Sequence, residues 1–155
     1  MGNTTGKLFR NTVSREIAAF PYDFSKNYYA LIQEAQKKGY EQCIITSDIM
    51  IELMEYFLMK QSTINSIEFF VEDTELESEI NTIIRKIKTN GIYWESLKNK
   101  LIFLSTENSI EIKAVTIKSL EYIIKIAVNG IFTVTSSFYG IISNELASFI
   151  GERTK

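Results

Sequence analysis

The fold is decided by a late stretch of the chain, Leu120-Glu-Tyr-Ile-Ile-Lys-Ile-Ala-Val-Asn129-Gly130-Ile-Phe-Thr-Val-Thr-Ser-Ser-Phe138. Two runs rich in β-branched and aromatic residues flank the Asn-Gly pair. Asn-Gly between such runs is the strongest short-range signal for a β-hairpin, because both residues accept the positive φ of the tight turn. The sequence therefore predicts an antiparallel hairpin centred on residues 129–130.

Upstream of the hairpin, predicted strands alternate with predicted helices. Caps, glycine stops and apolar spacing predict helices at 12–20, 25–39, 47–58 and 74–90. Short β-prone apolar runs predict buried strands at 42–46 and 67–71. Later elements are a helical turn at 93–98, strands at 101–104 and 110–117, and a last helix at 143–151.

This order predicts an α/β fold with α+β character in its second half. Strand-helix-strand alternation favours parallel strands joined by right-handed crossovers. We therefore expect a single mixed sheet, with parallel strands first, a late antiparallel hairpin and helices on the faces. Residues 1–11 are predicted to be a flexible N-terminus, and residues 12–155 a single globular domain.

Composition excludes several kinds of chemistry. The chain has no histidine and one cysteine, Cys43, so it cannot form a Ser-His-Asp triad, a Cys-His pair or an ordinary zinc site. The net charge of −2 and the lack of a basic stripe do not favour nucleic acid. A lone cysteine fits a reducing, cytoplasmic location. No apolar run reaches the roughly 18 residues that cross a bilayer.

Polar residues follow both predicted parallel strands, where α/β proteins bind ligands. A further polar run, 135–137, ends the hairpin. The candidate ligand-binding residues are Thr46, Ser47, Asp48, Glu72, Asp73, Thr74, Ser136 and Ser137. Helix capping explains the first six as well, and a turn explains the last two.

An enzymatic alternative rests on acidic residues. Asp48, Glu72 or Asp73 would bind Mg²⁺ in a hydrolase, a hard metal being the kind that carboxylates hold. Glu111 and Lys113 lie two apart on a predicted strand and so share one face, as in some metal-dependent nucleases. A charged, solvated sheet edge also explains this pair. The metal and any cofactor are left open.

Aromatic residues crowd the N-terminal third of the chain. They are Tyr22, Phe24, Tyr28, Tyr29 and Tyr40. Such residues line a pocket or a partner surface, or pack at the edge of the core with their hydroxyls in water.

Over about residues 25 to 151, the element order resembles a phospholipase D-like half-domain. The hairpin 119–137 and the following Ser143-Asn144-Glu145-Leu146 carry the resemblance. The family's catalytic histidine has no counterpart here; Ser119 or Glu121 stands near its place, and only Ser136 or Ser137 matches the polar end of the family's motif. The resemblance therefore implies a fold without the catalysis, as in histidine-less domains that sense small molecules or mediate dimers.

We therefore expect a non-catalytic regulatory module. It would bind a small molecule or a protein and form a homodimer. The alternatives are the Mg²⁺-dependent hydrolase or nuclease above and a small inhibitor that acts by surface contact.

Overall fold

The computed structural model describes residues 2–154, and these fall into two compact units. The terminal unit contains residues up to 45 together with those from 122 onward, and the central unit contains residues 46–121. The first and last parts of the chain build one unit and the middle builds the other. That residues 12–155 form a single domain stays a prediction.

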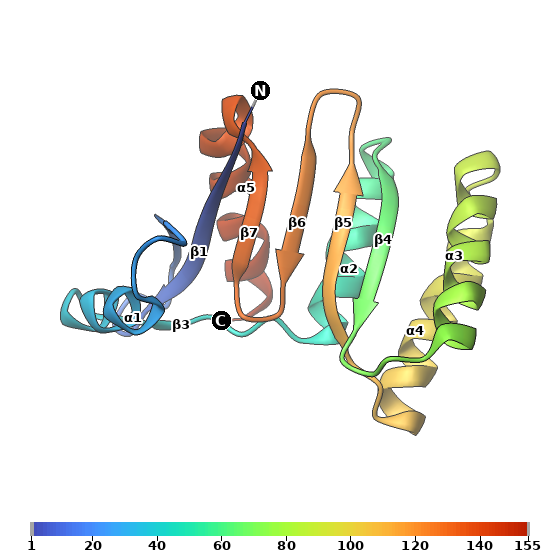
Figure 1. The fold of residues 1–155 in the computed structure, drawn as a ribbon, viewed down its shortest axis with the longest axis horizontal. Coiled ribbons are helices and arrows are strands. Elements are labelled where there is room, and N and C mark those ends of the chain that lie inside the picture. Colours follow the sequence, from blue (N-terminus) through green and yellow to red (C-terminus); the bar gives the residue numbers. More distant parts are fainter. Residues whose placement is uncertain (1, 155) are drawn as a thin grey trace. The chain divides into compact units, whose positions relative to one another are not determined.

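The terminal unit is an antiparallel sheet with two helices (Figure 1). Its elements are β1 (Asn3–Asn11), β2 (Ile17–Pro21), α1 (Tyr28–Lys37), β3 (Tyr40–Gln42), β6 (Ile123–Ala127), β7 (Ile131–Thr135), a 3₁₀ turn (Ser136–Phe138) and α5 (Tyr139–Arg153). Strand β1 pairs with β2 along one edge; its other edge is shared by β7 and β3.

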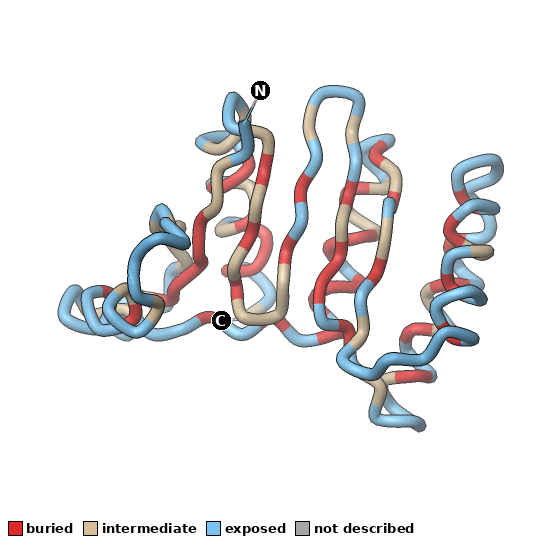
Figure 2. The backbone as a smooth tube through the Cα atoms, in the orientation of Figure 1, coloured by how far each residue is buried: buried red, intermediate tan, exposed pale blue. Residues whose placement is uncertain are grey.

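The predicted Asn-Gly hairpin is confirmed as β6 and β7. Gly130 has a φ of +84°, which this turn requires. Along β7, Phe132 and Val134 are buried and alternate with half-buried neighbours, as Figure 2 shows. Helix α5 packs on β1, β2 and β7 and buries Leu146 and Ile150.

The central unit consists of two strands and three helices. They are α2 (Ser47–Met59), β4 (Thr63–Phe69), α3 (Thr74–Thr89), α4 (Tyr93–Asn108) and β5 (Ile112–Lys118). Strands β4 and β5 are antiparallel, α2 packs on both, and α3 packs against α4. Within residues 2–154, no helix combines the length and the apolar character needed to span a bilayer.

The prediction that parallel strands come first is wrong. Every strand pairing that is described inside the two units is antiparallel, so the fold is α+β. The strand predicted at 42–46 overlaps β3 at Gln42 alone, and β3 pairs with β1. Of the strand predicted at 67–71, residues 67–69 lie in β4, which pairs with β5. Alternation of strands and helices does not fix strand direction, and here the helix between β3 and β4 is no crossover between parallel neighbours.

Two local predictions are also wrong. Residues 12–20 form the turn and second strand of a β1–β2 hairpin, because Asn11 Oδ1 accepts hydrogen bonds from the amides of Val13 and Ser14, both at 2.9 Å. Residues 101–104 belong to α4, where Trp94, Leu97, Leu101 and Leu104 are buried at helical spacing. The first eleven residues, for which the sequence predicts flexibility, contribute β1.

Candidate functional site

The predicted ligand residues of the central unit cap helices. Thr46 is the N-cap of α2 and accepts from the amide of Ile49 at 3.5 Å, and Asp48 lies exposed in the first turn. Asp73 caps α3, accepting from the amide of Leu76 at 3.1 Å, with Glu72 before it and Thr74 after it. These contacts satisfy helix amides that would otherwise lack a partner.

Ser47 and Glu111 are brought together, although sequence reasoning considered them separately. The buried Ser47 hydroxyl donates to Glu111 Oε2 and accepts from the amide of Ile112 at 3.0 Å. Glu111 Oε1 accepts from Ser105 Oγ at 2.9 Å. Lys113 is an exposed residue of β5. Both carboxylate oxygens of Glu111 therefore hold α2, α4 and β5 together.

No group of three carboxylate or thiolate side chains in residues 2–154 is arranged to hold a metal ion. Asp48, Asp73 and Glu111 therefore do not form a joint site in this structure. Ser136 and Ser137, in the terminal unit, lie in the exposed 3₁₀ turn. Ser136 Oγ accepts a hydrogen bond from Thr4 Oγ1 at 2.7 Å, which ties this turn to β1.

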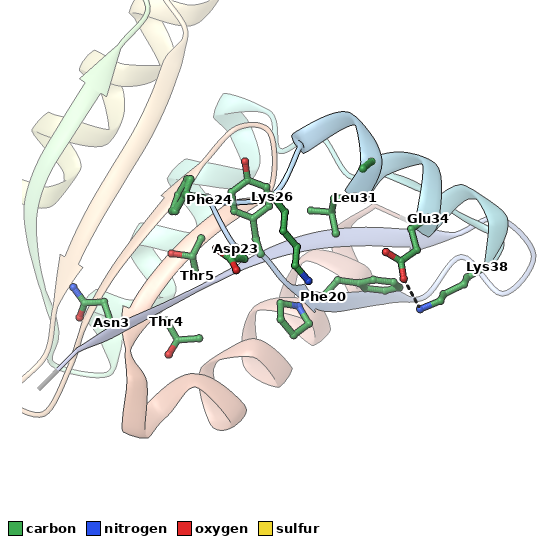
Figure 3. Close-up of a pocket in the computed structure, with 13 residues that line it drawn as sticks. Asn3, Thr4, Thr5, Phe20, Asp23, Phe24, Lys26, Leu31, Glu34 and Lys38 are labelled. Carbon is green, nitrogen blue, oxygen red and sulfur yellow. Dashed lines mark ion pairs between the residues drawn. The ribbon is translucent and has the colours of Figure 1, made fainter.

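The terminal unit instead contains a hollow of about 640 Å³, which we call the N-terminal trough. It lies between α1, the start of β1 and the loop that follows β2 (Figure 3). Its apolar lining comes from Phe20, Pro21, Tyr22, Phe24, Ala30 and Leu31. Its polar lining comes from Asn3, Thr4 and Thr5 on β1, and its charged lining from Asp23, Lys26, Glu34 and Lys38.

Local sequence builds the wall of the trough. Pro21 ends β2, and Asp23 then accepts hydrogen bonds from the amide and hydroxyl of Ser25, at 2.9 and 2.8 Å. Asn27 caps α1 by accepting from the amide of Tyr29 at 2.8 Å. Two polar turns therefore fix the loop between β2 and α1, and with it the aromatic side chains that the loop carries.

The rings in this loop contact one another edge to face. The centroids of Tyr22 and Phe24 are 4.7 Å apart at an interplanar angle of 86°, and those of Tyr22 and Tyr28 are 6.0 Å apart at 72°. Phe24 nevertheless remains 70% exposed. A large aromatic side chain held by a neighbouring ring but left in water is suited to covering a ligand.

Two of the four charges in the trough pair with each other, and a third accepts hydrogen bonds from the adjacent turn. Glu34 and Lys38 form an ion pair at 3.7 Å, and the Lys38 ammonium lies 5.7 Å from the centroid of Phe20. The hydrogen bonds from Ser25, first from its amide and then from its hydroxyl, lower the pKa of Asp23. Lys26 forms no ion pair within 4 Å among residues 2–154, although its charge also helps to lower the pKa of Asp23. Its side chain reaches across the trough towards Phe20 (Figure 3).

A buried cation lies elsewhere in the same unit. The side chain of Lys7 is fully buried; its ammonium donates to the carbonyl oxygen of Asn129 and lies 5.4 and 5.5 Å from the ring centroids of Phe9 and Tyr28. Burial lowers the pKa of Lys7 to about 8. Because the side chain is buried and its ammonium is bonded to Asn129, we interpret it as a link between β1 and the β6–β7 turn.

The sequence indicated part of the trough. The aromatic cluster in the N-terminal third includes Tyr22 and Phe24, which line it, whereas Tyr28, Tyr29 and Tyr40 are not among its lining residues. The β1 contribution was missed because residues 1–11 were predicted to be flexible. In β1, Leu8 and Arg10 lie on one face and Lys7 and Phe9 on the other. Both faces are buried there, so polar and apolar residues do not alternate in the way that would predict a strand.

Comparison of the chain with protein-family models, with curated proteins and with solved structures found no match. The resemblance to phospholipase D-like half-domains therefore stays a prediction. Function has to be argued from the geometry of the chain itself.

Proposed function

We propose that the protein is a non-catalytic binding module whose terminal unit holds an amphipathic organic ligand in the N-terminal trough. The observation that carries this proposal is the hollow itself, with its aromatic walls and few polar groups. Small-molecule sites typically have volumes of about 300–1,000 Å³ with mainly apolar walls and a few orienting polar groups. The trough fits this description in both size and lining.

The chemistry of the lining supports binding rather than catalysis. Its ionisable side chains are two carboxylates and two amines. Glu34 is paired with Lys38, and Asp23 accepts the hydrogen bonds of its own turn. General base catalysis needs a basic group whose pKa lies near the working pH, and a lowered pKa of Asp23 moves that group away from it.

The buried thiol supports a cytoplasmic location as part of the same proposal. Cys43 is 2% exposed and free, and burial raises its pKa. A protected thiol of this kind is compatible with a reducing compartment, where free thiols persist.

The test uses 8-anilinonaphthalene-1-sulfonate, an aromatic anion that fluoresces in apolar sites. We expect one saturable site on the folded protein, and binding weakened at least about tenfold by Phe24→Ser, which removes a contact worth about 1.4 kcal/mol or more. The matched control is Tyr29→Ser, since Tyr29 is 74% exposed, lies next to Tyr28 and does not line the trough. Equal binding by both variants and the parent protein would overturn the proposal.

A further inference from the structure

The start of β1 has a backbone edge that faces the trough. Hydrogen bonds along β1 alternate in direction: the amide of Leu8 donates to Gly130 on the β7 side, whereas the amide of Asn11 donates to Glu16 on the β2 side. Residues two apart on a strand point their N–H and C=O groups in the same direction. The odd-numbered residues of β1, Asn3 included, therefore direct these groups to the β2 side.

Strand β2 ends before it reaches Asn3. Its register with β1 runs from Ile17 opposite Arg10 to Pro21 opposite Gly6, and the amide of Tyr22 adds a last bond to the carbonyl of Thr5 at 3.0 Å. The turn at Asp23 then carries the chain away to α1. Among the described strands none pairs with Asn3 on this side, so its peptide N–H and C=O face the trough that Asn3 lines.

From this edge we infer that the ligand is an extended peptide that pairs with Asn3 as a short added strand. The inference rests on the proposed function of the trough. An exposed strand edge gives a peptide main-chain hydrogen bonds, and adjacent pockets select its side chains. A peptide residue opposite Asn3 satisfies the open amide and carbonyl together, because it presents a donor and an acceptor at the spacing of a neighbouring strand.

The lining selects the side chains of such a peptide. Phe24 and Leu31 offer an apolar contact for an aliphatic or aromatic side chain. Lys26 offers a cation that no carboxylate approaches within 4 Å among residues 2–154, its interaction with Asp23 being a longer-range one, and a peptide carboxylate is a natural partner for it. The peptide predicted here therefore carries an apolar side chain close to a carboxylate, such as a free C-terminus.

The test compares three synthetic versions of acetyl-Thr-Val-Thr-Phe by NMR titration of the ¹⁵N-labelled full chain. The first has a free C-terminal carboxylate, the second a C-terminal amide, and in the third the backbone nitrogens of the second and third residues are methylated. We expect the methylated peptide to bind at least about tenfold more weakly, because it cannot form the strand hydrogen bonds. The amide version is expected to bind more weakly by a smaller factor, and this difference is expected to vanish in Lys26→Met.

Variants of Asn3 test the same strand hydrogen bonds by changing the protein instead of the peptide. Asn3→Pro removes the amide that faces the trough and keeps the even-numbered bonds to β7, and proline is tolerated at the first residue of a strand. Asn3→Ala keeps the amide and is the matched control. We expect weaker peptide binding in the first variant and parent-like binding in the second.

The outcomes separate the two proposals. Equal binding of methylated and unmethylated peptides, or no peptide binding while the naphthalene sulfonate still binds in the trough, would overturn the peptide inference and leave the binding function standing. Failure of the naphthalene sulfonate as well would overturn both.

Discussion

The hydroxyl of Ser47 donates a hydrogen bond to the carboxylate of Glu111, although 64 residues separate them in the chain. From the sequence alone, Ser47 is a candidate ligand-binding residue and Glu111 a candidate residue of a metal-dependent nuclease. In the structure they are hydrogen-bonded to each other, and the Ser47 hydroxyl also accepts a hydrogen bond from the amide of Ile112. We interpret the pair as a structural contact that joins the start of α2 to the start of β5.

This interpretation predicts a loss of stability rather than of binding. Ser47→Ala leaves the buried amide of Ile112 without its partner, and we expect the free energy of unfolding to fall by about 1–3 kcal/mol. Urea denaturation measures it. The control Asp48→Asn changes an exposed charge in the first turn of α2, for which about 0.3–1 kcal/mol is expected. An unchanged urea midpoint in Ser47→Ala would contradict the structural role.

A second prediction concerns Gly6, which lies opposite Phe132 in the β1–β7 pair. A Cβ at this position would lie 2.7 Å from the hydroxyl of Tyr139 and 2.8 Å from the ring of Phe132. The rings of Phe132 and Tyr139 are stacked on each other, with centroids 5.8 Å apart. We expect Gly6→Ala to lower the free energy of unfolding by about 1–3 kcal/mol through overpacking.

The matched control for Gly6→Ala is Gly140→Ala. A Cβ on Gly140 meets nothing within 4 Å, and the residue lies in α5. Alanine there is expected to leave stability unchanged or to raise it by up to about 1 kcal/mol, because glycine is the poorer helix former. If both variants unfold at the parent's denaturant midpoint, the close packing around Gly6 is wrong.

The buried amine of Lys7 predicts a pH dependence. Its pKa is lowered from 10.5 to about 8, so between these values the unfolded chain binds a proton that the folded chain has released. Stability contributed by this group therefore rises as the pH increases from about 8 to 10.5, by at most about 3 kcal/mol.

The readout is the difference in unfolding free energy between the parent and Lys7→Met, measured by urea denaturation across that pH range. The difference cancels the contributions of groups that titrate independently of Lys7. The thiol of Cys43, whose pKa burial raises, interacts with the Lys7 ammonium and is therefore replaced by serine in both proteins. We expect the parent to gain stability relative to the variant as the pH rises. Parallel pH profiles would contradict the burial of a titrating amine.

The local signals that proved reliable are those that only one local backbone conformation satisfies. Asn129-Gly130 needs a backbone that few residues accept, and the hairpin is where the sequence predicts it. Helices α2 and α3 begin within one residue of the predicted caps: Thr46 caps α2 in place of Ser47 or Asp48, and Asp73 caps α3 in place of Thr74. An N-cap side chain contacts amides only a few residues away, so the start of a helix can be predicted from the local sequence.

Strand direction and the trough depended on contacts between distant residues. Nothing local shows that β1 pairs with β7 about 130 residues later, or that the central unit forms between them. The trough combines Asn3 with Leu31 and Lys26 because β1 pairs with β2 and the loop after β2 leads into α1. The aromatic cluster around Tyr22 and Phe24 was the only part of the site that sequence proximity disclosed.

The central claim, that the N-terminal trough is the binding site, is tested most directly by mapping amide chemical shifts while 8-anilinonaphthalene-1-sulfonate is titrated into the ¹⁵N-labelled chain. We predict saturable shifts at Thr5, Phe20, Lys26 and Leu31, with no comparable shifts at Ser47 or Asp73 in the central unit. Shifts concentrated in the central unit, or none at saturating probe, would contradict the account.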